Sequence, residues 1–226
     1  MKILGFIPAR KGSKRIKNKN LINFGGKPLI YYTINLCKKL RFVTPFVSTN
    51  SKKISIFAKK NGIKFNYLRP ENLSNDKSKI IESVFDALNW FEGKKIYFDA
   101  VMLLQPTNPI RKLQEVDEII KIFLNKKVSS IASVTKMKEH PFECVKIKKN
   151  NKWRYLVENK LKKKRAQDYP KDYYFIDGSV FLADVKFLRK NKDFITKNKT
   201  YLYKSSQFPG IDIDEAADLK IAKTFL

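Results

Sequence analysis

The sequence has few of the residues that disulfide frameworks and zinc centres require. Its 226 residues include two cysteines, Cys37 and Cys144, and one histidine, His140. Two cysteines far apart in sequence argue against a disulfide scaffold and fit a cytoplasmic setting. Because these three residues cannot complete the usual set of zinc ligands within one chain, a metal would have to be bound by carboxylates.

Long hydrophobic runs are absent as well. The longest apolar segments, such as residues 3–9 and 100–104, are far too short to cross a bilayer. The N-terminal stretch runs directly into charged residues, so neither a membrane segment nor a secretory signal is expected. With 43% hydrophobic residues the chain can bury one sizeable core. We therefore expect a single domain over residues 1–226 that carries an appendage.

Acidic residues are scarce: 21 Asp and Glu stand against 48 Lys and Arg, which gives a formal net charge of +27. Such a charge suits nucleic acid. The excess is mostly lysine spread over the whole length, however, and no basic strip interleaved with aromatic residues is present. Nucleic-acid binding therefore stays a remote alternative, and attraction of a small anionic molecule is the expected consequence of the charge.

Strand and helix patterns alternate along the chain. Short apolar runs predict strands at residues 3–9, 42–49, 63–70, 98–107, 128–137 and 174–183, and helical spacing predicts helices at 27–40, 51–62, 77–91 and 113–124. A final short strand segment and a terminal helix are expected in 210–226. Pro45 predicts an early or edge position for the second strand. The alternation predicts an α/β fold with a mainly parallel sheet covered on both faces, which binds ligands at the carboxyl ends of its strands.

The pattern changes at residues 135–172. "FECVKIKKNNKWRYLVEN" predicts a hairpin that turns at Asn150 and Asn151, and a charged connection follows it. This segment is too small to bury a core of its own, so we interpret it as an inserted arm.

The loop "RKGSKR" (residues 10–15) follows the first predicted strand directly. Backbone N–H groups and cationic side chains on such a loop can converge on the oxygens of a polyphosphate. The loop is neither a Walker A sequence nor G-x-G-x-x-G. On charge alone, an idle solvated turn in a lysine-rich protein remains the alternative.

The longer string "IPARKGSKRIKNKNLINFGGKPLI" resembles the N-terminal signature of the acylneuraminate cytidylyltransferase (CMP-nonulosonic acid synthetase) family. The family's Ala-Arg, Gly-Ser-Lys, Lys-Asn and Gly-Lys-Pro elements all stand here in order. "VSTNSKKISIFAKKNG", "LRPENLSND", "LLQPTNPIR" and "IDIDEAADLKIA" resemble later family segments, with Asn50 where an Asp is usual, so the resemblance covers nearly the whole chain.

This resemblance implies a three-layer nucleotidyltransferase (Rossmann-like) fold. It also implies a reaction in which CTP and a sialic, pseudaminic or legionaminic type of acid give a CMP-sugar and pyrophosphate for surface polysaccharide. By resemblance, the catalytic residues are Arg10, Lys14 and Lys19, and the nucleotide-binding residues are Arg10, Gly12, Ser13, Lys14, Lys19, Asn20 and Arg69. The implied contacts to the sugar acid are Gln105, Gln167, Asp168 and Asp177.

Asp212 and Asp214 alternate along an extended segment, so both carboxylates are expected on one face. Together with phosphate oxygens they would suit Mg²⁺. Alternatively, Asp214 caps the terminal helix. Two further residues stay open: Arg111 is either a ligand for the substrate carboxylate or structural, and His140 is either a general base or a structural or sugar-contacting residue.

The resemblance is weaker on the sugar side. Phe175 and Asp177 stand where sialate-activating members carry Arg and Asn, and Glu143 stands where they carry Lys. This weakens the assignment to sialic acid in particular, and the sequence around Asp177 is more similar to that of the pseudaminate-activating members. A CMP-Kdo synthetase or another sugar nucleotidyltransferase is the alternative enzyme.

By resemblance, the arm corresponds to the family's dimerisation element, which implies a homodimer in which Gln167 and Asp168 serve the partner's site. Four apolar residues of the hairpin would form the interface; alternatively they pack back onto the main core. These residues are Trp153, Tyr155, Leu156 and Val157.

Overall fold

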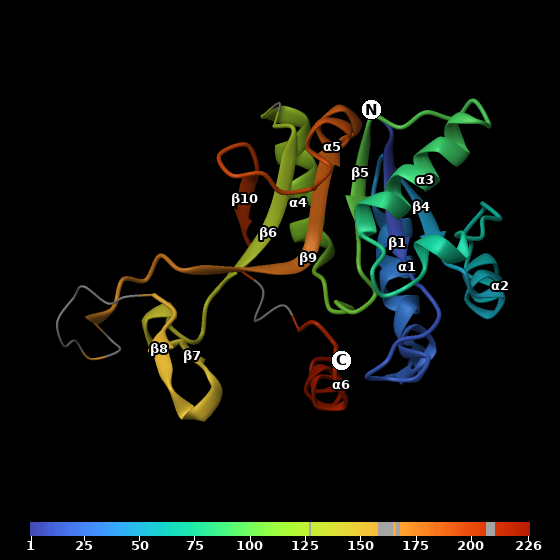
Figure 1. Cartoon of the computed structure of the whole chain (residues 1–226). Helices are drawn as coiled ribbons and strands as arrows, with labels where there is room; N and C mark the ends of the chain where they lie inside the picture. Colours follow the sequence, from blue (N-terminus) through green and yellow to red (C-terminus); the bar gives the residue numbers. More distant parts are fainter. Residues whose placement is uncertain (127, 158–164, 166–167, 207–210) are drawn as a thin grey trace.

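The computed structural model describes residues 1–126, 128–157, 165, 168–206 and 211–226. Its centre is a six-stranded sheet with the strand order β10-β6-β9-β5-β1-β4 (Figure 1). The strands are β1 (Ile3–Pro8), β4 (Val43–Ser48), β5 (Ala100–Leu103), β6 (Ser130–Lys136), β9 (Tyr174–Asp184) and β10 (Tyr201–Lys204). A short hairpin of β2 (Asn23–Phe24) and β3 (Lys27–Pro28) lies outside this sheet.

The sheet is mainly parallel, as predicted. β1 pairs in parallel with both β4 and β5, and β10 pairs in parallel with β6. β9 alone runs antiparallel, between β5 and β6. The connection from β6 to β9 is the arm rather than a crossover helix, and neighbouring strands joined without a crossover run antiparallel.

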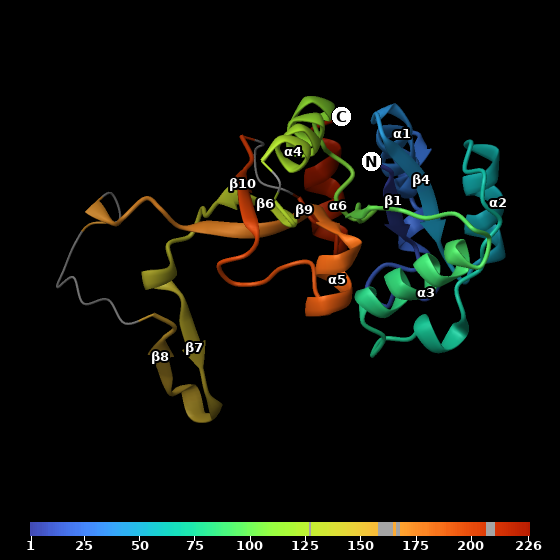
Figure 2. The same ribbon diagram turned by 90° about the horizontal axis from the view of Figure 1, so that it is seen from above.

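Helices cover both faces of the sheet, so the fold has three layers. In Figure 2, α1 and α4 lie on one side and α3 and α5 on the other. Side chains of β1 alternate accordingly: Ile3 and Ile7 join the core under α1 and α4, whereas Leu4 and Phe6 join the core under α3 and α5. The helices are α1 (Leu29–Lys39), α2 (Lys52–Lys60), α3 (Ile80–Glu92), α4 (Leu113–Asn125), α5 (Val185–Asn191) and α6 (Ala216–Lys223).

Two predicted strands are wrong, and one expected edge is right. Residues 63–70 and 211–214 have no strand pairing. In the first segment, Tyr67 is buried in the core under α3, and Arg69 N donates to Thr49 O at 2.8 Å. The apolar pattern of this segment therefore reflects packing against the core and not strand pairing. β4 lies at the sheet edge, as Pro45 indicates.

None of the helices in the described part of the chain is long and apolar enough to span a membrane.

The predicted hairpin is present in the segment 135–172. It consists of β7 (Val145–Ile147) and β8 (Trp153–Tyr155), which pair antiparallel. Asn150 and Asn151 form the turn with φ values of 62° and 57°, a conformation that asparagine tolerates better than most residues. Figure 1 shows the hairpin projecting away from the sheet. Trp153 and Tyr155 are 55% and 50% exposed, so they do not pack back onto the main core.

Candidate active site

A cleft of about 450 Å³ opens beyond the carboxyl ends of β1 and β5. Its walls come from the loop after β1, the segment between β4 and α3 with the start of α3, the loop after β5 and the residue Asp214 before α6. Figure 1 shows the loop after β1 and α6 at the same end of the sheet. Segments from both ends of the chain therefore meet where an α/β sheet binds its ligand.

The cleft collects most of the residues assigned to the nucleotide. The predicted site residues that line it are Arg10, Ser13, Lys14, Lys19, Asn20, Arg69, Gln105 and Asp214. Gly12 lies in the same loop with φ +89°, outside the cleft lining. Because only glycine adopts this backbone conformation readily, Gly12 shapes the loop between Arg10 and Ser13.

Two cations of the opening loop converge on one carboxylate. Arg10 Nη2 lies 2.7 Å from Asp76 Oδ1, and Lys14 Nζ lies 2.5 Å from Asp76 Oδ2. Hydrogen bonds from Lys14 and then from Arg10 lower the pKa of Asp76. The two side chains predicted to hold the triphosphate are thus side by side, close enough to bind neighbouring oxygens of one anion.

A second carboxylate, that of Asp214, pairs with both Lys19 and Arg15. Lys19 Nζ donates to Asp214 Oδ1 at 2.7 Å and to Ile213 O at 2.9 Å, and Arg15 Nη1 lies 2.5 Å from Asp214 Oδ2. The hydrogen bond from Lys19 is the main cause that lowers the pKa of Asp214. The helix-cap alternative for Asp214 is wrong, since Glu215 is the N-cap of α6.

Arg69 and Asn20 are buried in the wall of the cleft. Arg69 Nε donates to Ser48 Oγ at 2.9 Å and Nη2 donates to Ser48 O at 2.6 Å, at the end of β4. Burial lowers the pKa of Arg69 to about 10. Asn20 Nδ2 donates to Arg10 O at 3.2 Å. These bonds fix both polar groups before any ligand arrives, which suits recognition of a planar base.

Arg111 is structural. Its partly buried guanidinium donates to Ser179 O at 2.8 Å, to Gln105 O at 2.7 Å, to Thr33 Oγ1 at 3.2 Å and to Asn108 O. It ties the loop after β5 to β9 and α1, and it holds both ends of the turn that brings Gln105 into the cleft. The sequence left this role open between a substrate ligand and a structural residue.

The residues assigned to the sugar acid are dispersed within one chain. Gln105 lines the cleft. Asp177 is buried, accepts from Ser133 Oγ at 2.5 Å and from Ser179 N at 2.8 Å, and does not line the cleft. Asp168 lies on the arm, 3.2 Å from Arg165 Nε. Gln167 lies outside the described residues.

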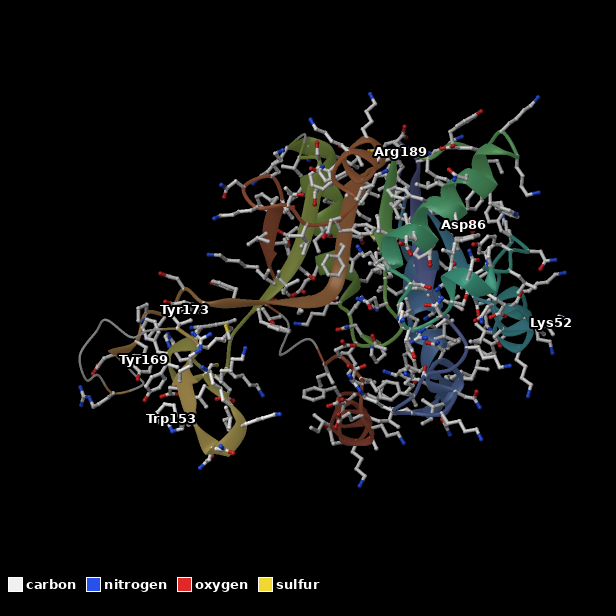
Figure 3. The ribbon with its side chains drawn as sticks, in the orientation of Figure 1. Lys52, Asp86, Trp153, Tyr169, Tyr173 and Arg189 are labelled. Carbon is white, nitrogen blue, oxygen red and sulfur yellow. The ribbon has the colours of Figure 1, made fainter. Side chains whose placement is uncertain are left out.

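His140 is a link within the arm. Its Nδ1 accepts from Phe142 N at 3.2 Å, and its Nε2 lies 3.1 Å from Pro170 O. The ring packs against Phe142, Tyr169 and Tyr173, and Figure 3 shows the two tyrosines where the arm joins β9, far from Asp86 on α3. Both ring nitrogens are engaged, so the geometry supports the structural alternative rather than a general base in the cleft of the same chain.

The donor set at the end of the chain fits Mg²⁺ better than zinc. Asp214 faces the cleft, while Asp212 is exposed and accepts weakly from Asn108 Nδ2 at 3.4 Å. Over the ranges that the structure describes, no three His, Cys, Asp or Glu side chains gather into a metal cluster. Asp212 does not line the cleft, so the structure places one of the two expected carboxylates there. A carboxylate that is completed by phosphate oxygens and water would suit Mg²⁺.

Sequence reasoning missed two residues of the site. Asp76 ends the segment "LRPENLSND", which also contains Glu71, and nothing in that segment marks it as a partner of the opening loop. Asn50 Oδ1 accepts from Lys11 N at 2.8 Å, and its Nδ2 donates to Glu71 Oε2 at 2.9 Å. Asn50 thereby fastens the opening loop to the segment that carries Asp76. The one sign of this role in the sequence was that position 50 carries Asn where the family usually carries Asp.

Comparisons with known proteins identify the family of the chain. The family model described as cytidylyltransferase matches residues 4–220. The chain is 33% identical to the CMP-N,N'-diacetyllegionaminic acid synthase of Legionella pneumophila, over 100% of this chain and 97% of that protein. It is 31% identical to the pseudaminic acid cytidylyltransferase of Campylobacter jejuni, over 99% and 95%.

Among solved structures, the fold is similar to that of a CMP:2-keto-3-deoxy-manno-octonic acid synthetase complexed with CTP. The TM-score is 0.69 at 15% identity, over 100% of this chain and 98% of that one. This likeness is one of fold, and it confirms the predicted nucleotidyltransferase architecture. With a matching family model and full-length relatives, the chain belongs to the cytidylyltransferase family.

Proposed function

We propose that this cytidylyltransferase transfers CMP from CTP to a free nine-carbon 2-keto sugar acid and releases pyrophosphate. The observation that carries the proposal is the pairing of four cations in one cleft, Arg10 with Lys14 and Arg15 with Lys19, around two carboxylates. Such density of positive charge at strand ends suits a triphosphate. The full-length likeness to synthetases of legionaminic and pseudaminic acids supports the acceptor class.

In this reaction the anomeric hydroxyl oxygen of the acid bonds to the α-phosphorus. The bond from that phosphorus to the oxygen bridging the β-phosphorus breaks, and the hydroxyl proton passes to solvent or to the departing pyrophosphate. Arg10 and Lys14 would bind the β- and γ-phosphates, and Lys19 would neutralise charge on the α-phosphate and leaving group. Positioning and charge neutralisation supply most of the catalysis in such a displacement.

Asp212 and Asp214 would hold Mg²⁺. When bound, the ion neutralises phosphate charge and can lower the pKa of the attacking hydroxyl. Asp214 has a second role that needs no metal: its carboxylate holds Lys19 Nζ at 2.7 Å, so Lys19 is already oriented toward the cleft.

The acceptor is proposed to be of the legionaminic or pseudaminic type rather than sialic acid. The cations that sialate-activating members carry are replaced here by Phe175, which is 59% exposed, and by Glu143 on the arm. The product would feed surface polysaccharide synthesis from the cytoplasm.

The protein is further proposed to act as a homodimer through the arm. Exposed apolar side chains on the hairpin include Ile147 at 66% and Trp153 at 55%, and exposed patches of this kind usually contact a partner. The arm would carry Asp168 toward the partner's cleft. Ile147→Lys combined with Trp153→Ala should convert the dimer to monomers in analytical ultracentrifugation, and a variant that still sediments as the wild type would contradict this arrangement.

A charge reversal tests the enzyme against the nucleic-acid alternative. Lys14→Glu should abolish CTP turnover, because it places a carboxylate where phosphate must bind, yet change nucleic-acid retention only slightly, as one phosphate contact among many. The matched control is Lys52→Glu, exposed at the start of α2 and labelled in Figure 3, which should keep full turnover. Normal turnover in Lys14→Glu would refute the proposed site.

A further inference from the structure

The carboxylate of Asp76 lies between two cations of the opening loop. One of its carboxylate oxygens faces Arg10 Nη2 and the other faces Lys14 Nζ. A phosphate presents neighbouring oxygens to cations in the same manner. The side chains of Arg10, Lys14 and Asp76 are 36%, 76% and 41% exposed, so an incoming anion can reach this pair.

The segment that carries Asp76 is held independently of that carboxylate. Asn75 Oδ1 accepts from Lys77 N at 2.9 Å and from Ser78 N at 3.0 Å, and Asn75 Nδ2 donates to Asn72 O at 2.8 Å. Ser78 Oγ donates to the same Asn72 carbonyl at 3.0 Å. Because this turn makes its own hydrogen bonds, a neutral residue at position 76 should leave its path unchanged.

We propose that Asp76 is a phosphate surrogate: it holds Arg10 and Lys14 in place when the cleft has no nucleotide, and it sets the affinity for CTP and pyrophosphate by competing for them. The proposal rests on the proposed function. CTP must exchange the carboxylate for its own phosphate oxygens. After transfer, the carboxylate can retake the two cations and assist release of pyrophosphate, to which it is a repulsive neighbour.

In this role, removing Asp76 should change the affinity for polyphosphates in the direction opposite to removing an ordinary binding residue. Removing the carboxylate frees two cations and removes a like charge, so polyphosphates should bind more tightly. Exposed ion pairs are individually weak, and losing two of them corresponds to about a three- to tenfold decrease in Kd. A residue that merely preorganises the cations would give weaker binding when removed.

The test is isothermal titration of wild type, Asp76→Asn and Asp76→Ala with CTP and separately with pyrophosphate, with Mg²⁺ and without acceptor. Both neutral variants should bind both ligands about three- to tenfold more tightly, and pyrophosphate should become a stronger product inhibitor. The matched control is Asp193→Asn, which makes the same change of net charge at an exposed residue after α5 and should stay within twofold of wild type.

The outcomes separate this role from the proposed function. Unchanged or weaker binding in both neutral variants, or an equal gain in Asp193→Asn, overturns the surrogate role and leaves the enzyme assignment standing. Tighter binding without transfer to any sugar acid supports the surrogate role and overturns the acceptor class. If wild type binds neither CTP nor pyrophosphate, both proposals are wrong.

Discussion

Replacing Arg111 by methionine should destabilise the protein by about 3 kcal/mol. The guanidinium is partly buried between α1, β9 and the loop after β5, where it donates to Ser179 O, Gln105 O and Asn108 O as well as Thr33 Oγ1. Methionine fills a similar volume without any donor. The three carbonyls would then lose this donor, and two of them belong to the buried residues Asn108 and Ser179.

The magnitude follows from two opposing effects. Each buried acceptor left without its donor costs about 1–3 kcal/mol. Against this, methionine removes the penalty of burying a charge, which is evident in the pKa of Arg111, lowered to about 9 by burial although Asp177 and Asp212 act to raise it. The lost bonds outweigh this relief, because two of the acceptors belong to buried residues and a third lies beside them, which gives a net loss of about 3 kcal/mol.

Urea unfolding followed by circular dichroism would measure the change. The matched control is Arg189→Met, whose guanidinium pairs with Glu92 at 2.6 Å with both side chains about two-fifths exposed. An exposed pair contributes about 0–1 kcal/mol, so this variant should stay close to wild type. Equal stabilities of the two variants would refute the reasoning that Arg111 holds the loop of Gln105.

Two further predictions concern stability. Hydrogen bonds from Lys19 and then Arg15 lower the pKa of Asp214, so its carboxylate stabilises the fold fully above the unfolded aspartate pKa of about 4 and less as the pH falls through the lower folded value. In calorimetry, Asp214→Asn should therefore have a lower Tm than wild type at pH 7, and this difference should shrink below about pH 4. A difference that does not change with pH would contradict this reasoning. Gly178 has φ +70°, so Gly178→Ala should lower the free energy of unfolding in urea by about 1 kcal/mol. The control is Gly93→Ala at the end of α3, where the backbone is right-handed helical, and it should leave the free energy of unfolding unchanged. Similar losses in both variants would contradict the argument that Gly178 is needed for its positive φ.

Local patterns were enough to predict the α/β class and the longest elements. β1 and β5 are short buried runs, and α3 and α4 have apolar residues at helical spacing, so burial and periodicity determine them directly. The opening loop was predictable for the same reason, because it is a run of adjacent residues at the end of a strand.

Other features depend on contacts between distant residues. The apolar pattern of 63–70 results from packing under α3 and not from strand pairing. Asp177 follows a sequence motif but is turned into the interior by Ser133, 44 positions away. The pairing of Arg10 with Asp76, 66 positions apart, leaves no local trace, so no pattern in either segment could reveal it.

The most direct test of the central claim is pyrophosphate release by the purified protein with Mg²⁺, CTP and a panel of acids. The panel contains legionaminic, pseudaminic and sialic acids and Kdo, with ATP, GTP and UTP as nucleotide controls. We predict release with CTP and a nine-carbon acid of the legionaminic or pseudaminic type, and no release with the other nucleotides. Release with Kdo alone, or no release with any acid despite measurable CTP binding, would contradict the account.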